Sequence, residues 1–331
     1  MVTVVDALNI FEVLGSLETL AEDNMTKMLG NNGEGEDEQD ERGIAQLMLD
    51  QIEFANVILL SKVDLVKREG AVEQIRALLQ KLNPSARIIV SSPHFSDLPL
   101  SSVVNTRLFD MEEAEESVGW AQELAKHADG GAGHTPETEE YGISSVVFSN
   151  AERPFHTGRL ETLLDGYCGS YSGGDGAGTS AFSGVVRAKG QLWVASANAY
   201  PVDFHAAGRH VQLVPSSRPY LAATARHEWD QSDHEQCGRL VAEGTWHFVH
   251  GDRESEVVFI GVALDRARIL DELSAALLTD AEVAGGSAGW KAFEDVFFGG
   301  RYFEISSEEQ GAQTMGSEDG HGYSLKVAKE R

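Results

Sequence analysis

Two residues separated by one position, Lys62 and Asp64, have the side chains needed to recognise a guanine base. A carboxylate at Asp64 can accept hydrogen bonds from both the N1–H and the exocyclic amine of guanine, a pair of donors that adenine does not present. The aliphatic stem of Lys62 can lie across the plane of the base. Because Ser61-Lys62-Val63-Asp64 directly follows the apolar run 57–60, we expect this motif at the end of a buried strand.

A second group of chemically active residues lies between His227 and Cys237 and could bind a divalent metal ion. It holds two imidazoles, four carboxylates and one thiol within eleven residues. Imidazole nitrogen and thiolate sulfur are preferred ligands of zinc. We therefore take His227, His234 and Cys237 as candidate metal ligands, in a stretch predicted to be a solvated loop. Their spacing matches no standard zinc motif, so a charged surface loop without metal is the alternative.

The elements around the guanine motif alternate between strand and helix, which is typical of a parallel sheet with crossover helices. An acidic segment at residues 31–42 is too polar to bury apolar surface and is predicted to be a surface insert. Residues 1–115 are therefore interpreted as half of a nucleotide-binding domain. We expect strands at residues 2–5, 55–60 and 86–92, and helices at 7–20, 44–54 and 71–82.

The composition changes to acidic residues and glycine over residues 116–140, which we interpret as a linker. Residues 141–300 are predicted to form an α+β domain with mostly antiparallel strands. One expected hairpin spans 184–197 and turns at Lys189-Gly190. The mainly polar residues 301–331 are predicted to be a flexible tail. Further strands are expected at 141–150, 211–214 and 256–264, and helices at 157–166 and from 265 onward.

Charge and composition restrict the possible partners of the 331-residue chain. A formal net charge of −27 argues against a nucleic-acid backbone and against an anionic membrane surface. No apolar run approaches the ~20 residues of a membrane helix, and the first residues lack the basic region of a signal peptide. The two cysteines, Cys168 and Cys237, form no C-x-x-C pair. These features predict a cytoplasmic protein with neither nucleic acid nor membrane as a partner.

Several short stretches, in a fixed order along the chain, identify a family. They lie at residues 2–7, 51–65, 82–86, 153–156, 184–190 and 251–261. Together they resemble the CobW-like family of P-loop metallochaperone GTPases, which includes cobalamin-synthesis, nitrile-hydratase-activator and zinc-chaperone proteins. The expected fold is the C-terminal half of a P-loop GTPase parallel sheet, followed by an α+β CobW C-terminal domain.

The resemblance also implies ligands and partners. GTP would be the nucleotide, zinc or cobalt the delivered ion, and a client metalloprotein the partner. Ser61, Lys62 and Asp64 would contribute to the guanine site, although Ser61 replaces an asparagine whose amide braces this loop in the family. Self-association into a homo-oligomer is left open.

The sequence departs from this family at the phosphate and metal motifs. It contains neither a G-x-x-G-x-G-K-[ST] loop nor a Cys-x-Cys-Cys motif, and the glycine-rich residues 173–180 lack the lysine and precede a strand. We therefore expect an N-terminally truncated relative that neither binds GTP tightly nor hydrolyses it alone. Two alternatives are a non-catalytic interaction or regulatory module that kept the scaffold, and an incomplete gene model.

Overall fold

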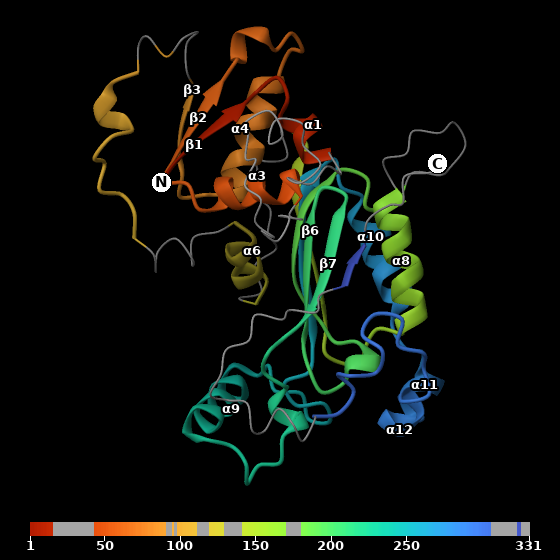
Figure 1. Cartoon of the computed structure of the whole chain (residues 1–331). Helices are drawn as coiled ribbons and strands as arrows, with labels where there is room; N and C mark the ends of the chain where they lie inside the picture. Colours follow the sequence, from red (N-terminus) through yellow and green to blue (C-terminus); the bar gives the residue numbers. More distant parts are fainter. Residues whose placement is uncertain are drawn as a thin grey trace, which may run out of the picture.

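A computed structural model of the chain describes residues 1–15, 43–90, 95, 98–110, 119–128, 141–169, 180–305 and 323–325. The acidic segment 31–42, the glycine-rich stretch 173–179 and residues 129–140 lie outside this part. Two β-sheets organise the described residues, a small one near the N-terminus and a larger one in the second half (Figure 1). Within this part, no helix has the length and apolar character needed to cross a membrane.

The N-terminal unit contains a parallel sheet of three strands in the order β1-β2-β3. The parallel pairing and the alternation with helices confirm the predicted half of a nucleotide-binding sheet. Helix α4 ends where expected, because Pro84 disfavours continuation of the helix through Asn83. The strands are β1 (Val2–Asp6), β2 (Val57–Ser61) and β3 (Arg87–Val90), and the helices are α1 (Ile10–Gly15), α3 (Ile44–Glu53), α4 (Ala71–Leu82), η1 (Val63–Leu65) and η3 (Leu100–Ser102).

The second sheet is antiparallel and has six strands in the order β4-β8-β5-β6-β7-β9. This arrangement confirms the predicted α+β domain. Its strands are β4 (Ile143–Asn150), β5 (Val185–Leu192), β6 (Val202–Ala207), β7 (His210–Pro215), β8 (Ser255–Val262) and β9 (Tyr323–Leu325). The remaining helices are α6 (Gly119–Ala128), α8 (Thr157–Gly169), α9 (Gln231–Glu243), α10 (Arg266–Ala276), α11 (Asp280–Ala284), α12 (Gly286–Trp290), η4 (Ala195–Ala197) and η5 (Leu221–Ala223).

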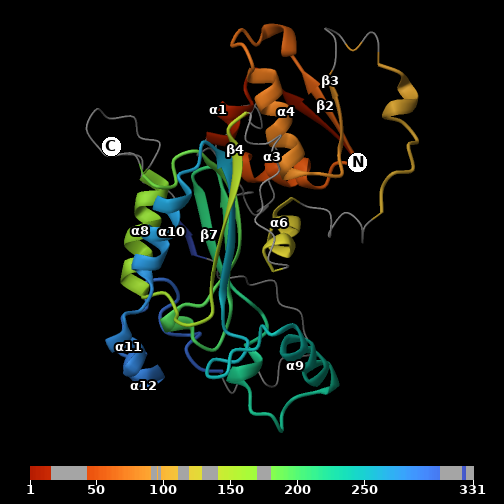
Figure 2. The same cartoon turned by 180° about the vertical axis from the view of Figure 1, so that it is seen from behind.

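Both faces of the six-stranded sheet are covered, which explains why residues 257–260 of strand β8 are apolar without interruption. Val257 and Phe259 belong to a core with residues of α8 and α10, whereas Val258 and Ile260 belong to a core with residues of α3 and α4. Figures 1 and 2 show α8 and α10 on one side of this sheet, with α6 and the N-terminal unit on the other. A strand buried on both faces does not show the alternation of a half-exposed strand.

The two units are also joined by buried charges. Arg187 of β5 donates to both carboxylate oxygens of Glu53 at the end of α3, over 2.8 and 2.9 Å. Their side chains are only 1% and 2% exposed. Lys81 of α4 pairs with Glu123 of α6 at 2.8 Å, so the range expected to be a linker contains a helix that packs between the two units. Helices α3 and α4 therefore pack against both the three-stranded and the six-stranded sheet.

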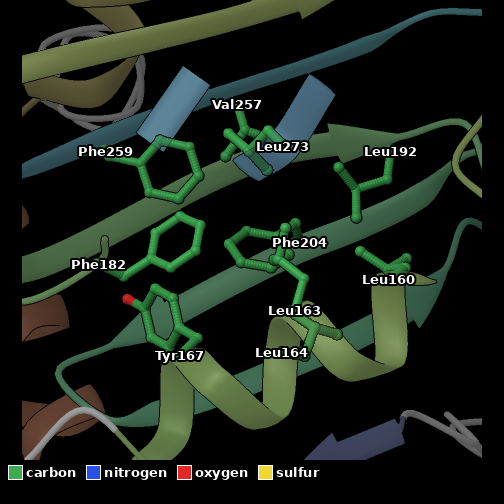
Figure 3. A pocket seen from close by; sticks show the side chains of 10 residues that line it. All are labelled: Leu160, Leu163, Leu164, Tyr167, Phe182, Leu192, Phe204, Val257, Phe259 and Leu273. Carbon is green, nitrogen blue, oxygen red and sulfur yellow. The ribbon is translucent and has the colours of Figure 1, made fainter. Parts of the chain in front are cut away.

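The core between α8 and the six-stranded sheet is densely filled. Figure 3 shows the ten apolar and aromatic side chains that line a small gap in it, including Tyr167, Phe182 and Phe204. The volume of this cavity is about 10 Å³. Such a space holds at most one water molecule, and an apolar lining gives a water few partners. This part of the domain is a packing core and offers no ligand site.

Three local expectations were wrong or incomplete. The hairpin at Lys189-Gly190 does not exist, because β5 runs straight through both residues. A Cβ at Gly190 would lie 2.0 Å from the carbonyl oxygen of Glu256, so this glycine permits close strand approach and does not form a turn. Strand β6 was missed despite the alternation of Val202 and Phe204 with polar residues. In the expected tail, β9 pairs with β7.

Candidate functional site

The guanine motif forms a fixed loop at the carboxyl end of β2. Lys62 follows the strand in the left-handed conformation, with φ 56° and ψ 28°. The short helix η1 begins at the next residue, and the N–H of Leu65 donates to the carbonyl of Lys62 at 3.1 Å. The structure thus confirms that the motif ends a buried strand, since all residues of β2 before Ser61 are buried.

Lys62 is held by a residue that sequence reasoning missed. Its Nζ lies 2.6 Å from Oδ2 of Asp6, the last residue of β1. Burial alone would raise the pKa of Asp6, but the hydrogen bond from Lys62 and the N–H of Leu8 outweigh it, so the pKa is lowered. The parallel register explains the contact, because Asp6 lies opposite Ser61 and adjacent parallel strands end at the same edge. The sequence alone showed only that each of these two residues ends an apolar run.

Ser61 ties the loop to β1. Its Oγ donates to the carbonyl of Val5 at 3.0 Å, and the carbonyl of Ser61 accepts from the N–H of Ala7 at 2.9 Å. The loss of an asparagine amide at this position is therefore partly offset by a hydroxyl contact to the neighbouring strand. Both hydrogen bonds fix the end of β1 beside the motif.

Asp64 has the exposure that a base-reading carboxylate needs. Its side chain is exposed, and no group among the described residues donates a hydrogen bond to it. Both oxygens are thus available to the paired N–H donors of guanine. The stem of Lys62 is anchored at Asp6 and its side chain is 50% exposed. These residues suit the base of GTP, whereas the structure shows no corresponding group for its phosphates among the residues described.

The candidate metal ligands do not form a compact group. His227 is 83% exposed, while His234 and Cys237 lie one turn apart on α9. The Nδ1 of His234 is 2.7 Å from the carbonyl oxygen of Asp230 and is therefore engaged with the backbone. Across the described ranges, no group of three or more His, Cys, Asp or Glu residues is arranged to hold a metal ion. The zinc site at these residues stays a prediction.

The prediction of a loop at residues 227–237 was wrong, because most of this stretch is helical. Helix α9 begins at Gln231, and its first turn is closed by a capping box in which the side chains of Asp230 and Asp233 each accept from the other's backbone N–H. Two capping carboxylates three residues apart are a sequence signal for a helix start. The acidic character of the stretch obscured this signal.

Comparison with protein families places the two units. Residues 1–90 match the model of the CobW/HypB/UreG nucleotide-binding domain, and residues 143–277 match that of the cobalamin synthesis protein CobW C-terminal domain. The chain therefore combines a CobW/HypB/UreG nucleotide-binding domain with a CobW C-terminal domain.

The names of several similar proteins mention zinc, a GTPase or both. The chain is 37% identical over 297 residues to the zinc-regulated GTPase metalloprotein activator 1 of Dictyostelium discoideum, covering 89% of this chain and 55% of that protein. It is 30% identical over 264 residues to a zinc chaperone of Mycobacterium tuberculosis, covering 80% and 56%. A crystal structure of the Zn(II)-bound YjiA GTPase from E. coli shows 19% identity, 83% and 60% coverage, and a TM-score of 0.32. The chain thus spans about half the length of the curated relatives it matches.

Proposed function

We propose that this chain is the guanine-recognising part of a GTP-dependent metallochaperone that delivers zinc to a client metalloprotein. The observation that carries the proposal is the exposed carboxylate of Asp64 beside the anchored Lys62, on a loop fixed at the end of β2. The two domain matches and the names of the relatives support the class. GTP would supply the phosphoanhydride bond whose hydrolysis drives the cycle, and the residues of this chain would hold its base.

The affinity of the chain alone for GTP is expected to be low. Individual hydrogen bonds contribute only about 1–3 kcal/mol, and a dissociation constant of ~1 mM corresponds to about 4 kcal/mol of binding free energy. Phosphates and their magnesium ion normally supply much of the nucleotide affinity through backbone N–H groups and a lysine. Base contacts at Lys62 and Asp64 therefore give millimolar binding at best and no hydrolysis.

The N-terminal sheet offers a place for the phosphate-binding part. Thr3 and Val5 are buried on the side of α3 and α4, whereas Val2 and Val4 on the opposite face are 41% and 54% exposed. Parallel sheets are usually covered on both faces. We propose that the phosphate-binding part of a nucleotide-binding domain packs on the face of Val2 and Val4, as a segment of a longer chain or as a separate one.

Zinc is the proposed cargo, with His227, His234 and Cys237 as its candidate ligands in this chain. The position of His234 and Cys237 one turn apart on α9 supports at most two ligands from that helix. Calorimetric titration with zinc checks the assignment, because binding that survives Cys237→Ser and His234→Ala would place the metal elsewhere.

Recognition of the base can be tested by NMR with free nucleosides. Guanosine at millimolar concentration is expected to shift the amide signals of residues 61–65, and adenosine is expected to leave them unchanged. Asp64→Asn should weaken the affinity for guanosine, measured from these shifts, at least tenfold. The same variant should respond to xanthosine, because the asparagine amide can donate to the carbonyl that replaces the guanine amine. Glu69→Gln, an exposed change in the same region, is the matched control.

Two results would contradict the proposal. An equal response to adenosine, or an unchanged response in Asp64→Asn, would show that the loop does not read guanine. Micromolar, magnesium-dependent binding of GTP by this chain would instead overturn the expectation that base contacts act alone.

A second candidate function is a non-catalytic interaction module that keeps the scaffold. The observation in its favour is a hairpin closed by two backbone hydrogen bonds that presents Phe248 to solvent, with 97% of that residue exposed. Such a module needs no nucleotide, so the absence of any guanosine response in the NMR experiment would favour it.

A further inference from the structure

Residues 247–251 form a short hairpin whose backbone is held by several hydrogen bonds. We call it the tip hairpin. His247 and Gly251 exchange two backbone hydrogen bonds, at 2.7 and 2.9 Å. The Nδ1 of His247 also accepts the N–H groups of Val249 and His250, at 3.2 and 3.0 Å. The rings of His247 and His250 stack with centroids 4.7 Å apart. The backbone at this tip is therefore already ordered.

The base of the tip hairpin packs tightly while its apex is bare. Gly251 has φ +69°, and a Cβ there would lie 2.3 Å from the Cβ of Ala222. The ring of His250 also packs on the buried Trp193, with centroids 4.8 Å apart. At the apex, however, Phe248 is 97% exposed and Val249 is 70% exposed. An exposed aromatic side chain on an ordered backbone has the properties of a binding anchor, because association then costs side-chain entropy but little further backbone entropy.

Several carboxylates lie at the same end of the sheet. The tip hairpin leads through two residues into Glu254, directly before β8. In β5, Gln191 lies opposite both Asp203 of β6 and Glu256 of β8, so these two carboxylates share one face of the sheet. No described group donates a hydrogen bond to Asp203, Glu254 or Glu256. Glu152 adds an exposed carboxylate whose Oε2 is 3.5 Å from Nε2 of His247.

Nearby cations compensate the negative charge of these carboxylates only in part. Burial, followed by the charges of Glu256 and Asp252, raises the pKa of Glu254 to about 7. Burial also raises the pKa of Asp203 and of Glu256, against weaker effects of nearby cations. Figures 1 and 2 show α9 on the same side of the sheet as α6, opposite α8 and α10, so this end of the sheet is flanked by α9. A positively charged group would relieve the repulsion.

We propose that the tip hairpin and the carboxylates Glu152, Asp203, Glu254 and Glu256 form a docking surface for a partner protein that presents apolar side chains flanked by lysine or arginine. The apolar side chains would contact Phe248, and the basic rim would pair with the carboxylates. A second copy of the chain is the wrong occupant on electrostatic grounds, because each copy carries a formal net charge of −27. This contact does not depend on guanine recognition, so either proposal can fail without the other.

A fluorescein-labelled helical peptide of leucine and lysine, about 15 residues long, tests the surface by fluorescence anisotropy. Two control peptides replace either its leucines by serine or its lysines by glutamate, and both should bind at least tenfold more weakly. Phe248→Ala should weaken binding of the leucine-lysine peptide at least tenfold. The double variant Glu254→Gln/Glu256→Gln should weaken it to a similar extent. Neither change should lower the melting temperature.

Matched control variants separate this surface from general attraction to an acidic protein. Phe109→Ala removes a half-exposed aromatic residue elsewhere, and Asp271→Asn removes an exposed carboxylate on α10. Both should leave peptide binding unchanged. The proposal is overturned if these controls match the effects of the surface variants. It is also overturned if Phe248→Ala abolishes self-association of the chain in analytical ultracentrifugation, or binding of the chain to phosphatidylcholine vesicles.

Discussion

At the scale of single residues, the left-handed backbone of Lys62 shows how the guanine motif is held. A non-glycine residue with positive φ is uncommon and is maintained only by its surroundings. Here Asp6 holds the ammonium group from the neighbouring strand at 2.6 Å. Both side chains are partly exposed, so the pair contributes little to global stability. The pair instead fixes the position of the Lys62 ammonium group at the end of β1.

Glu254 gives a pH-dependent prediction for stability. Its pKa is raised from an ordinary 4.5 to about 7, so the folded protein binds its proton more tightly than the unfolded chain does. The stability contributed by this group is complete below pH ~4.5 and is lost as the pH rises through about 7. Glu254→Gln keeps a neutral side chain, and we therefore expect it to raise the melting temperature at pH 8 but not at pH 4.

The control for Glu254→Gln is a variant with the same chemical change at an exposed site. Glu243→Gln, near the end of α9, provides it, because Glu243 is exposed. Melting curves of both variants between pH 4 and 8 decide the matter. A Glu254→Gln curve parallel to that of the wild type at all pH values would contradict the assigned environment.

At the scale of elements, substitutions at two glycines test how closely β5 approaches β8 and how much open space surrounds α9. A Cβ at Gly190 would lie 2.0 Å from a backbone oxygen, whereas a Cβ at Gly238 of α9 would meet nothing within 4 Å. Gly190→Ala should therefore destabilise the fold by about 1–3 kcal/mol through forced displacement of β8. Gly238→Ala should stabilise α9 by about 0.5–1 kcal/mol, since alanine is the better helix former.

Urea unfolding measures the first effect, and amide hydrogen exchange in α9 measures the second. Equal effects of the two substitutions would mean that helix and strand propensity alone determines them. An unaffected Gly190→Ala variant would show that β5 and β8 do not approach as closely as described.

Element boundaries show which local signals are reliable. Helix α4 and strand β2 were predicted well, because each has a strong apolar pattern and a clear terminating signal such as Asn83-Pro84. Strand β5 was wrongly predicted to turn at Lys189-Gly190. Glycine is common in turns, but here it is needed because β8 approaches too closely for a side chain. Helix α9 was missed because it has no buried residue, and hence no apolar stripe, to reveal it.

At the scale of the whole molecule, the ion pair between Arg187 of β5 and Glu53 of α3 joins the two units. Removal of one partner leaves a buried charge uncompensated, so Arg187→Met should destabilise the fold by about 3–5 kcal/mol. The double variant Arg187→Met/Glu53→Leu should recover most of this loss, because neither charge then remains buried. Urea unfolding of the wild type, both single variants and the double variant measures the coupling.

Lys291→Met is a suitable control, since its pair with Glu304 is exposed on both sides, at 60% and 70%. It should change the free energy of unfolding by less than about 1 kcal/mol. A loss in the double variant equal to the sum of the single losses would show that the two residues act independently. The shared interface would then not depend on this pair.

The sequence by itself determined the two units and the position of the proposed guanine motif, because both rest on local patterns. Apolar runs specify the strands, amphipathic repeats specify the helices, and the side-chain chemistry of Lys62 and Asp64 predicts guanine as the base. The tertiary structure decided which distant residues complete those patterns. The parallel register brings Asp6 to Lys62, the packing of α3 on the second sheet pairs Glu53 with Arg187, and the hairpin exposes Phe248. Such contacts depend on strand order and helix packing, which no local spacing along the chain encodes.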